Sequence, residues 1–179
     1  MEKSLVLIDG ENIFRSWGTY CRQNNIKKDV DYVKLINKVT EGTNLLRAIF
    51  YDGVPETIPV GKKKFLEALQ HNNIQLKTKI LKKRSHKCLD CNVVSKRDVQ
   101  KGVDVSLATD ILRHSLQNSC DVCIIVSGDE DYKDAIEVAK ERGVKIWVVS
   151  FKNCLSKELR LSSDKLILLD DIFESLVKN

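Results

Sequence analysis

The sequence predicts an α/β fold, a three-layer sandwich with helices on both faces of a mainly parallel central sheet. Apolar runs of strand length alternate along the chain with amphipathic stretches of helix length, which is the pattern of parallel βαβ units. Residues 5–8 and 122–126 are apolar at every position, as strands are when both faces of a sheet are covered. With 179 residues, 42% of them hydrophobic, the chain is expected to form a single domain over residues 1–179.

In the first half of the chain, each expected strand leads into helical segments. The strands are expected over residues 5–8, 45–51 and 74–81, and the helices over residues 12–23, about 31–42 and 60–71. Asp29 or Asp31 is suited to cap the second helix. Residues 74–81 alternate apolar side chains with polar or basic ones, which predicts a half-exposed edge strand.

The second half repeats this alternation after an interruption. Strands are expected over residues 121–126, 144–150 and 165–169, and helices over residues 103–116, 132–142 and 172–177. Residues 82–100 have no periodicity and are expected to form a basic loop insert that carries Cys88 and Cys91. A loop of that length inside a compact domain is usually functional or poorly ordered.

The charge of the chain permits nucleic-acid binding without requiring it. Thirty Lys and Arg residues stand against 25 Asp and Glu, a formal net charge of +5, and the excess is concentrated between Lys77 and Lys101. No apolar run is long enough to cross a bilayer, and residues 5–8 are too few for a signal-peptide core. A cytoplasmic protein without a membrane partner is therefore expected.

Acidic side chains follow the expected strands at the edge of the sheet where α/β proteins bind ligands. Asp9 ends the first strand, Asp129 follows the strand at 121–126, and Asp104 opens a helix. Carboxylates held together repel one another unless a cation is present, and Mg²⁺ or Mn²⁺ is the cation that prefers such oxygens. Asn12 could orient the scissile phosphate or a metal-bound water without adding charge. Taken singly, each aspartate is equally suited to capping a turn or a helix.

Three short segments with acidic residues follow one another along the chain: residues 7–12 (LIDGEN), 101–105 (KGVDV) and 127–132 (SGDEDY). In sequence and in order they resemble the signature blocks of the NYN domain, a PIN-like nuclease group that includes LabA-like bacterial proteins. The resemblance covers residues 3 to about 170 and implies a PIN-like, Rossmann-like fold that cleaves RNA with divalent metal. It also implies that Asp9, Asp104 and Asp129 are metal-binding catalytic acids, with Asn12 and Asp131 at accessory positions. Two departures are the extra carboxylate of Glu11 and Tyr132 in place of the commoner Phe.

The leading hypothesis is a ribonuclease that hydrolyses RNA phosphodiester bonds with Mg²⁺ or Mn²⁺. The alternative is an RNA-binding or regulatory module of the same fold with little or no activity. A haloacid-dehalogenase phosphatase is disfavoured because residues 9–11 (DGE) imitate its D-x-D motif only loosely, and no phosphate-binding glycine loop follows any strand.

The basic stretch is expected to contact RNA phosphates without reading sequence. Its candidate contacts are Lys82, Lys83, Arg84, Lys87, Lys96, Arg97 and Lys101. Trp17, Tyr20 and Tyr132 are candidates for base stacking, although the helical spacing of Trp17 favours the core.

His86, Cys88 and Cys91 are candidate ligands of a structural Zn²⁺, which normally takes four. Two free thiols, or a pair completed across a homodimer, remain open alternatives. Cys123 lies in an apolar run and is expected in the core. The C-x-x-C spacing of Cys120 and Cys123 is therefore not interpreted as a metal site. Asp110 lies about 120° around the helix from Asp104 and is expected to pair with a lysine or to support the site from behind.

Overall fold

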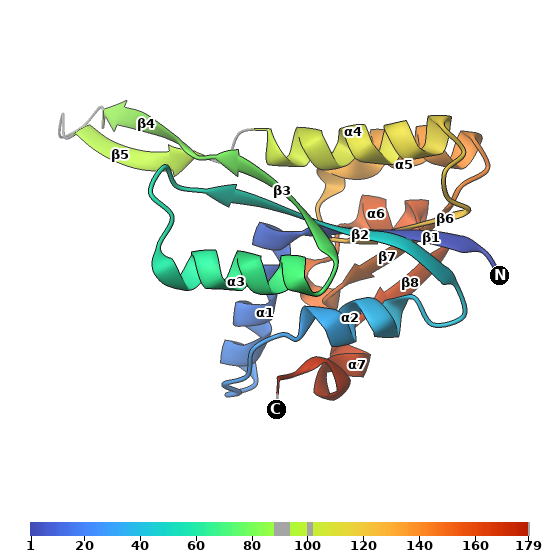
Figure 1. Ribbon diagram of the computed structural model, residues 1–179, viewed down its shortest axis with the longest axis horizontal. Coiled ribbons are helices and arrows are strands. Elements are labelled where there is room, and N and C mark those ends of the chain that lie inside the picture. Colours follow the sequence, from blue (N-terminus) through green and yellow to red (C-terminus); the bar gives the residue numbers. More distant parts are fainter. Residues whose placement is uncertain (88–93, 100–101, 179) are drawn as a thin grey trace.

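The computed structural model describes the backbone of residues 1–87, 94–99 and 102–178, and the side chains of these residues outside 82–87 and 94–99. Its centre is a six-stranded, all-parallel sheet in the order β3-β2-β1-β6-β7-β8 (Figure 1). The strands are β1 (Lys3–Asp9), β2 (Asn44–Val54), β3 (Ile74–Ile80), β6 (Val122–Val126), β7 (Lys145–Ser150) and β8 (Lys165–Leu168). The predicted three-layer α/β fold is confirmed, and β3 is an edge strand as expected.

Helices cover both faces of the sheet. One face carries α1 (Gly10–Gln23), α2 (Tyr32–Val39), α3 (Val60–His71) and α7 (Leu169–Leu176). The other face carries α4 (Val103–Leu116), α5 (Lys133–Glu141) and α6 (Lys157–Ser162). Each face has its own apolar core, because alternate residues of β1 point to opposite sides: Val6 and Ile8 to one, Leu5 and Leu7 to the other.

The start of α1 fixes the geometry of the strand end that precedes it. Asp9 caps the helix by accepting a hydrogen bond from the Asn12 amide at 3.0 Å. A Cβ atom at Gly10 would lie 2.6 Å from the Phe50 ring and 2.7 Å from the Tyr51 carbonyl oxygen. Because glycine has no side chain, α1 can begin directly against β2. The helix therefore starts two residues earlier than its apolar spacing predicts. Of the two expected caps of α2, Asp31 is the one used.

The prediction of a loop is wrong for residues 82–87 and 94–99, while residues 88–93 and 100, with Cys88 and Cys91, lie outside the described residues. β4 (Lys82–Lys87) and β5 (Val94–Val99) pair as an antiparallel ribbon that extends from the body of the molecule beside β3 (Figure 1). Residues 82–87 and 94–99 lack the alternation of apolar and polar side chains by which a strand is recognised in a sequence.

Two short helical segments also have no counterpart in the predicted elements. These are α6 and the 3₁₀ turn η2 (Lys152–Cys154), both in the connection between β7 and β8. Cys120 and Cys123 are buried free thiols, consistent with Cys123 as a core residue. None of the helices in the described part of the chain has the length and apolar character needed to cross a lipid bilayer.

Asp110 anchors α4 to the edge of the sheet. Its carboxylate is 1% exposed and accepts hydrogen bonds from Tyr51 of β2 and Lys77 of β3, each at 2.5 Å, with Arg113 3.1 Å away. Burial opposes ionisation, but these partners outweigh it and lower the pKa of Asp110. The expected pairing with a lysine is confirmed, and it holds α4, the helix that carries Asp104 in its first turn.

Candidate active site

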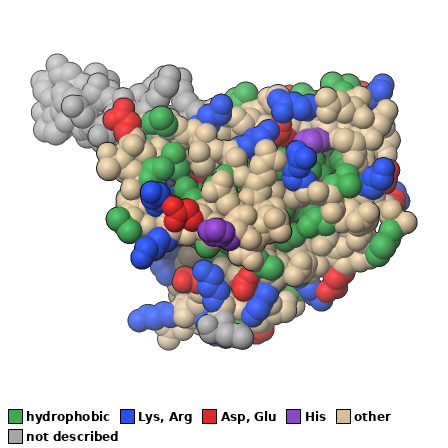
Figure 2. All heavy atoms as spheres, viewed as in Figure 1, with side chains coloured by type: hydrophobic (Ala, Val, Ile, Leu, Met, Phe, Trp, Pro, Cys, Tyr) green, Lys and Arg blue, Asp and Glu red, His purple; other side chains and the backbone are tan. Residues whose placement is uncertain are grey.

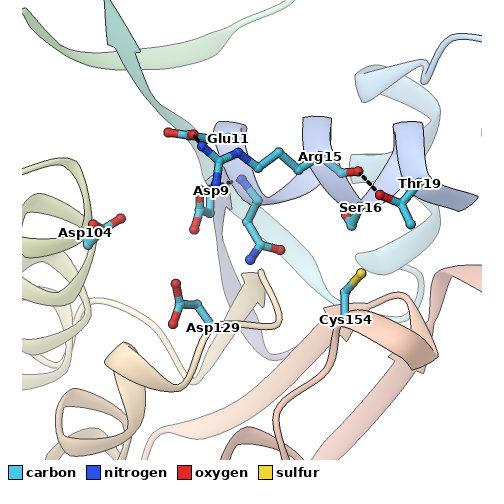
Figure 3. Close-up of a pocket in the computed structure, with 9 residues that line it drawn as sticks. Asp9, Glu11, Arg15, Ser16, Thr19, Asp104, Asp129 and Cys154 are labelled. Atoms are coloured by element: carbon cyan, nitrogen blue, oxygen red, sulfur yellow. Dashed lines mark hydrogen bonds and ion pairs between the residues drawn. The ribbon is translucent and has the colours of Figure 1, made fainter. Parts of the chain in front are cut away.

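The carboxyl ends of the two central strands, together with the start of α4, surround one pocket of about 340 Å³. β1 and β6 are neighbours in register, with Ile8 beside Val126, so the residues that follow them lie side by side. Figure 3 shows Asp9, Asp104 and Asp129 facing the same space from β1, from α4 and from the segment after β6. The structure thus brings together acids that are up to 120 residues apart in sequence.

Asp9 is the buried acid of the pocket, with 3% of its surface exposed. One carboxylate oxygen accepts the Asn12 amide, and the other accepts hydroxyl hydrogens from Tyr132 at 2.8 Å and Ser127 at 3.2 Å. Burial raises the pKa of Asp9, and these three hydrogen bonds lower it in part. The side chain is therefore held in one orientation with its charge only partly offset.

Tyr132 connects two of the acids. Its ring is fully buried, and its hydroxyl lies 2.8 Å from Asp9 Oδ2 and 3.4 Å from Asp104 Oδ1. A phenol has one hydrogen, so it cannot donate fully to both carboxylates. Burial raises the pKa of Asp104, and the charges of Asp9 and Asp129 raise it further.

Asn12 and Asp129 complete this arrangement. The Asn12 side-chain oxygen accepts the Gly128 amide at 3.2 Å, which links α1 to the segment after β6. Asp129 caps the 3₁₀ turn η1 (Glu130–Tyr132) by accepting the Asp131 amide at 3.2 Å. Asp131 itself is exposed and does not line the pocket, although its charge contributes to raising the pKa of Asp104.

Comparison with known proteins assigns the chain to a family. The model of the NYN domain matches residues 3–170. The chain belongs to the NYN domain family. Members of this family are generally PIN-like nucleases.

Two individual proteins resemble this NYN domain over most of its length. The low amplitude and bright protein LabA of Synechococcus elongatus is 28% identical over 169 residues, which cover 93% of this chain and 83% of that protein. A crystal structure of a protein of unknown function from Vibrio parahaemolyticus superposes with a TM-score of 0.71 at 20% identity, covering 99% of this chain and 96% of that one. The second likeness shows the fold alone.

Some residues of the NYN pocket are absent from the sequence-based set. Glu11, Arg15, Ser16, Thr19 and Cys154 also line it, and Glu11 forms an ion pair with Arg15 at its rim (Figure 3). Helical spacing from Asn12 could have indicated Arg15, Ser16 and Thr19, since residues three, four and seven positions on share a helix face. The sequence gives no signal for Cys154, which comes from the connection after β7.

The pocket suits a hard divalent cation that keeps much of its water. Within residues 1–81 and 102–178, no group of three or more His, Cys, Asp or Glu is close enough to enclose a metal ion. Mg²⁺, however, is usually held by one or two carboxylates, several waters and the substrate's phosphate, without a closed protein cage. Asp9 and Asp104, with one shared hydroxyl hydrogen and raised pKa values, supply such carboxylates.

The raised pKa of Asp104 predicts a measurable pH dependence of stability. A carboxyl with a higher pKa in the folded protein binds protons on folding, so the free energy of unfolding falls as pH rises from 3.8 through the folded pKa. In EDTA at pH 7, Asp104→Asn should therefore have a higher melting temperature than the wild type. The difference should vanish near pH 4 in thermal melts followed by circular dichroism. A variant that melts lower at pH 7 would contradict this electrostatic picture.

The other residues named from the sequence divide into two groups. Trp17 is buried in the core, as its helical spacing favoured, and the suggestion that Tyr132 stacks a base is wrong because its ring is buried too. Tyr20 is half-buried and packs against Phe151 and Phe173 with ring centroids 4.7 Å apart. The remaining predictions concern side chains outside the described residues. These are the zinc candidates His86, Cys88 and Cys91 and the phosphate contacts Lys82, Lys83, Arg84, Lys87, Lys96, Arg97 and Lys101.

Proposed function

We propose that this NYN domain is a metal-dependent ribonuclease that hydrolyses phosphodiester bonds of RNA in the pocket formed by Asp9, Asp104 and Asp129. The observation that carries the proposal is the convergence of these three carboxylates, from three separate segments, on one open pocket. Membership of a family whose members are generally nucleases supports the same activity.

The chain's own residues have distinct parts in this proposal. Asp9, Asp104 and Asp129 would hold Mg²⁺ or Mn²⁺, which when bound lowers the pKa of a water and offsets charge on the leaving oxygen. Tyr132 and Ser127 fix the orientation of Asp9 through their hydroxyl hydrogens. Because the oxygen of Asn12 is occupied by the Gly128 amide, its NH₂ group remains to donate to a phosphate oxygen.

The second candidate is an RNA-binding or regulatory module with little or no activity. It is favoured by the spacing of the acids, none of which, among the described residues, belongs to a closed metal-binding group. The two candidates differ in one property. A ribonuclease must lose phosphodiester cleavage when the divalent cation is removed, whereas a binding module has no cleavage to lose.

The test is cleavage of end-labelled single-stranded RNA by the purified wild type in Mg²⁺, in Mn²⁺ and in EDTA. We expect cleavage with either cation, none in EDTA, and recovery when excess Mn²⁺ is added back. The activity should follow the 20.4 kDa protein through size-exclusion chromatography, which separates it from contaminating nucleases. Salt-sensitive RNA binding with no cleavage under any condition would instead establish the binding module.

A further inference from the structure

A second, larger hollow of about 990 Å³ runs along α1 beside the acidic pocket. We call it the α1 groove and define it by α1, the loop over residues 24–31 and the start of α3. Arg15 and Thr19 line both the groove and the acidic pocket, so the two spaces adjoin. A chain lying in the groove would therefore reach the acids directly.

The wall of the groove is fixed by hydrogen bonds. The Trp17 indole donates to the Lys28 carbonyl at 2.8 Å, and the Ile26 amide donates to the Cys21 carbonyl at 2.8 Å. Farther along the loop, the Asp31 amide donates to the Leu176 carbonyl at 2.7 Å. The loop is thus held against α1 and α7, and the groove is formed before any ligand arrives.

The floor of the groove is apolar and open. Phe14 is 78% exposed although it is a large aromatic side chain, and it lies one position before Arg15. Gly18 has no atom within 4 Å of where a side chain would begin. Alanine there would stabilise the helix without a clash, so glycine leaves space open at a cost to helix stability.

Basic side chains outnumber acidic ones along the rim of the groove, where Asp29 is the one carboxylate among the lining residues that the structure describes. Arg22 and Lys27 line the rim, and in the described part of the chain neither has a carboxylate within ion-pair distance. Arg22 is instead held by a hydrogen bond to the Thr19 hydroxyl at 3.1 Å. Lys28 and Lys62 also line the groove, although each pairs with a carboxylate. Figure 2 shows Lys and Arg side chains over α3 and the neighbouring lower part of the molecule, where Asp and Glu side chains are interspersed with them, and further Lys and Arg side chains over the upper part of the same face.

We propose that the α1 groove binds single-stranded RNA and guides it into the acidic pocket, a role that rests on the proposed function and names its substrate path. A cationic rim binds the phosphates, and an exposed aromatic ring stacks a base; together these are the parts of a single-strand binding surface. Phe14 supplies the aromatic ring, and Arg22 and Lys27 supply the positive charge. Arg15 lies where the groove meets the acidic pocket. Because an identical rim would repel this one, the same charges disfavour a second copy of the chain as the occupant.

The test measures the affinity of a fluorescein-labelled twelve-nucleotide oligouridylate by anisotropy in EDTA, where no metal-dependent cutting can occur. Phe14→Ala should weaken binding about tenfold through loss of one stacked base. The double variant Arg22→Glu, Lys27→Glu should also weaken it, and the slope of log Kd against log salt should become shallower by about 1.4, or about 0.7 per phosphate. Leu161→Ala and the double variant Lys157→Glu, Arg160→Glu, all exposed on α6, are the matched controls and should bind as the wild type does.

Each outcome separates the groove from the catalytic proposal. If the wild type cuts RNA with Mn²⁺ but the groove variants bind RNA unchanged, the groove proposal is overturned and the ribonuclease stands. If the wild type cuts nothing but the variants lose affinity, the groove stands as a binding site without catalysis. The groove proposal is overturned if the wild type binds no RNA. It is also overturned if Phe14→Ala changes self-association in sedimentation and leaves the affinity for RNA unchanged.

Discussion

Asp104→Asn is expected to lower the rate of metal-dependent RNA cleavage at least about a hundredfold, because charge stabilisation by a bound cation is worth several kcal/mol. Asparagine keeps the shape of the side chain and removes the negative charge that faces Asp9 and Asp129. Since Asp104 is only half-buried and caps no helix, the fold should survive the change. The measurement is single-turnover cleavage of labelled RNA in saturating Mn²⁺.

The matched control is Asp171→Asn, which removes an exposed carboxylate on α7 and should cut at the wild-type rate. Binding of the twelve-nucleotide RNA should change little in Asp104→Asn, so that the loss lies in the chemical step. Equal cleavage by wild type and Asp104→Asn would remove Asp104 from the site and would point to a contaminating nuclease.

Gly128→Ala is expected to destabilise the protein by about 3 kcal/mol and to disturb the pocket, because it forces apart packed backbone. A methyl group at Gly128 would overlap the Cys154 carbonyl oxygen and lie 2.7 Å from Ser150 Oγ. The same glycine carbonyl accepts the Ser156 amide at 2.9 Å, and its amide donates to Asn12. Moving it would therefore shift Asn12 and Asp129 together.

Urea unfolding followed by circular dichroism gives the free-energy change for this variant. Gly61→Ala in α3 is the control, since no atom lies within 4 Å of the added carbon and helix propensity favours alanine by about 1 kcal/mol. If Gly128→Ala is as stable as the wild type, the close approach of residues 128 and 154 does not hold in solution.

The fold could be predicted from the sequence because its strands are buried on both faces. Residues 5–8 and 122–126 are recognisable without knowledge of their neighbours, and parallel order follows from the helices between them. The β4–β5 ribbon and α6 escaped prediction for the opposite reason. The ribbon strands have no alternation of apolar and polar residues, and α6 spans only six residues, less than two helical turns.

The acids of the site were predictable from their place after strands, but their partners were not. Tyr132 lies 123 residues from Asp9 in the chain, and only the packing of η1 under β1 brings its hydroxyl to the carboxylate. In the sequence, the position of Tyr132 beside Asp131 indicates an exposed aromatic side chain. By contrast, the helical spacing of Trp17 indicated its burial correctly, and Phe14, three positions earlier on the same helix, lies off that apolar face and is exposed.

The most direct test of the carboxylate site is Mn²⁺ binding measured by isothermal titration calorimetry on the wild type and on Asp9→Asn, Asp104→Asn and Asp129→Asn. If the three side chains form one metal site, the wild type binds Mn²⁺ and each single substitution weakens that binding at least about tenfold, while Asp171→Asn binds like the wild type. Equal Mn²⁺ affinity in all five proteins, or no detectable binding by the wild type in the presence of RNA, would contradict the assignment of these aspartates to a metal-dependent active site.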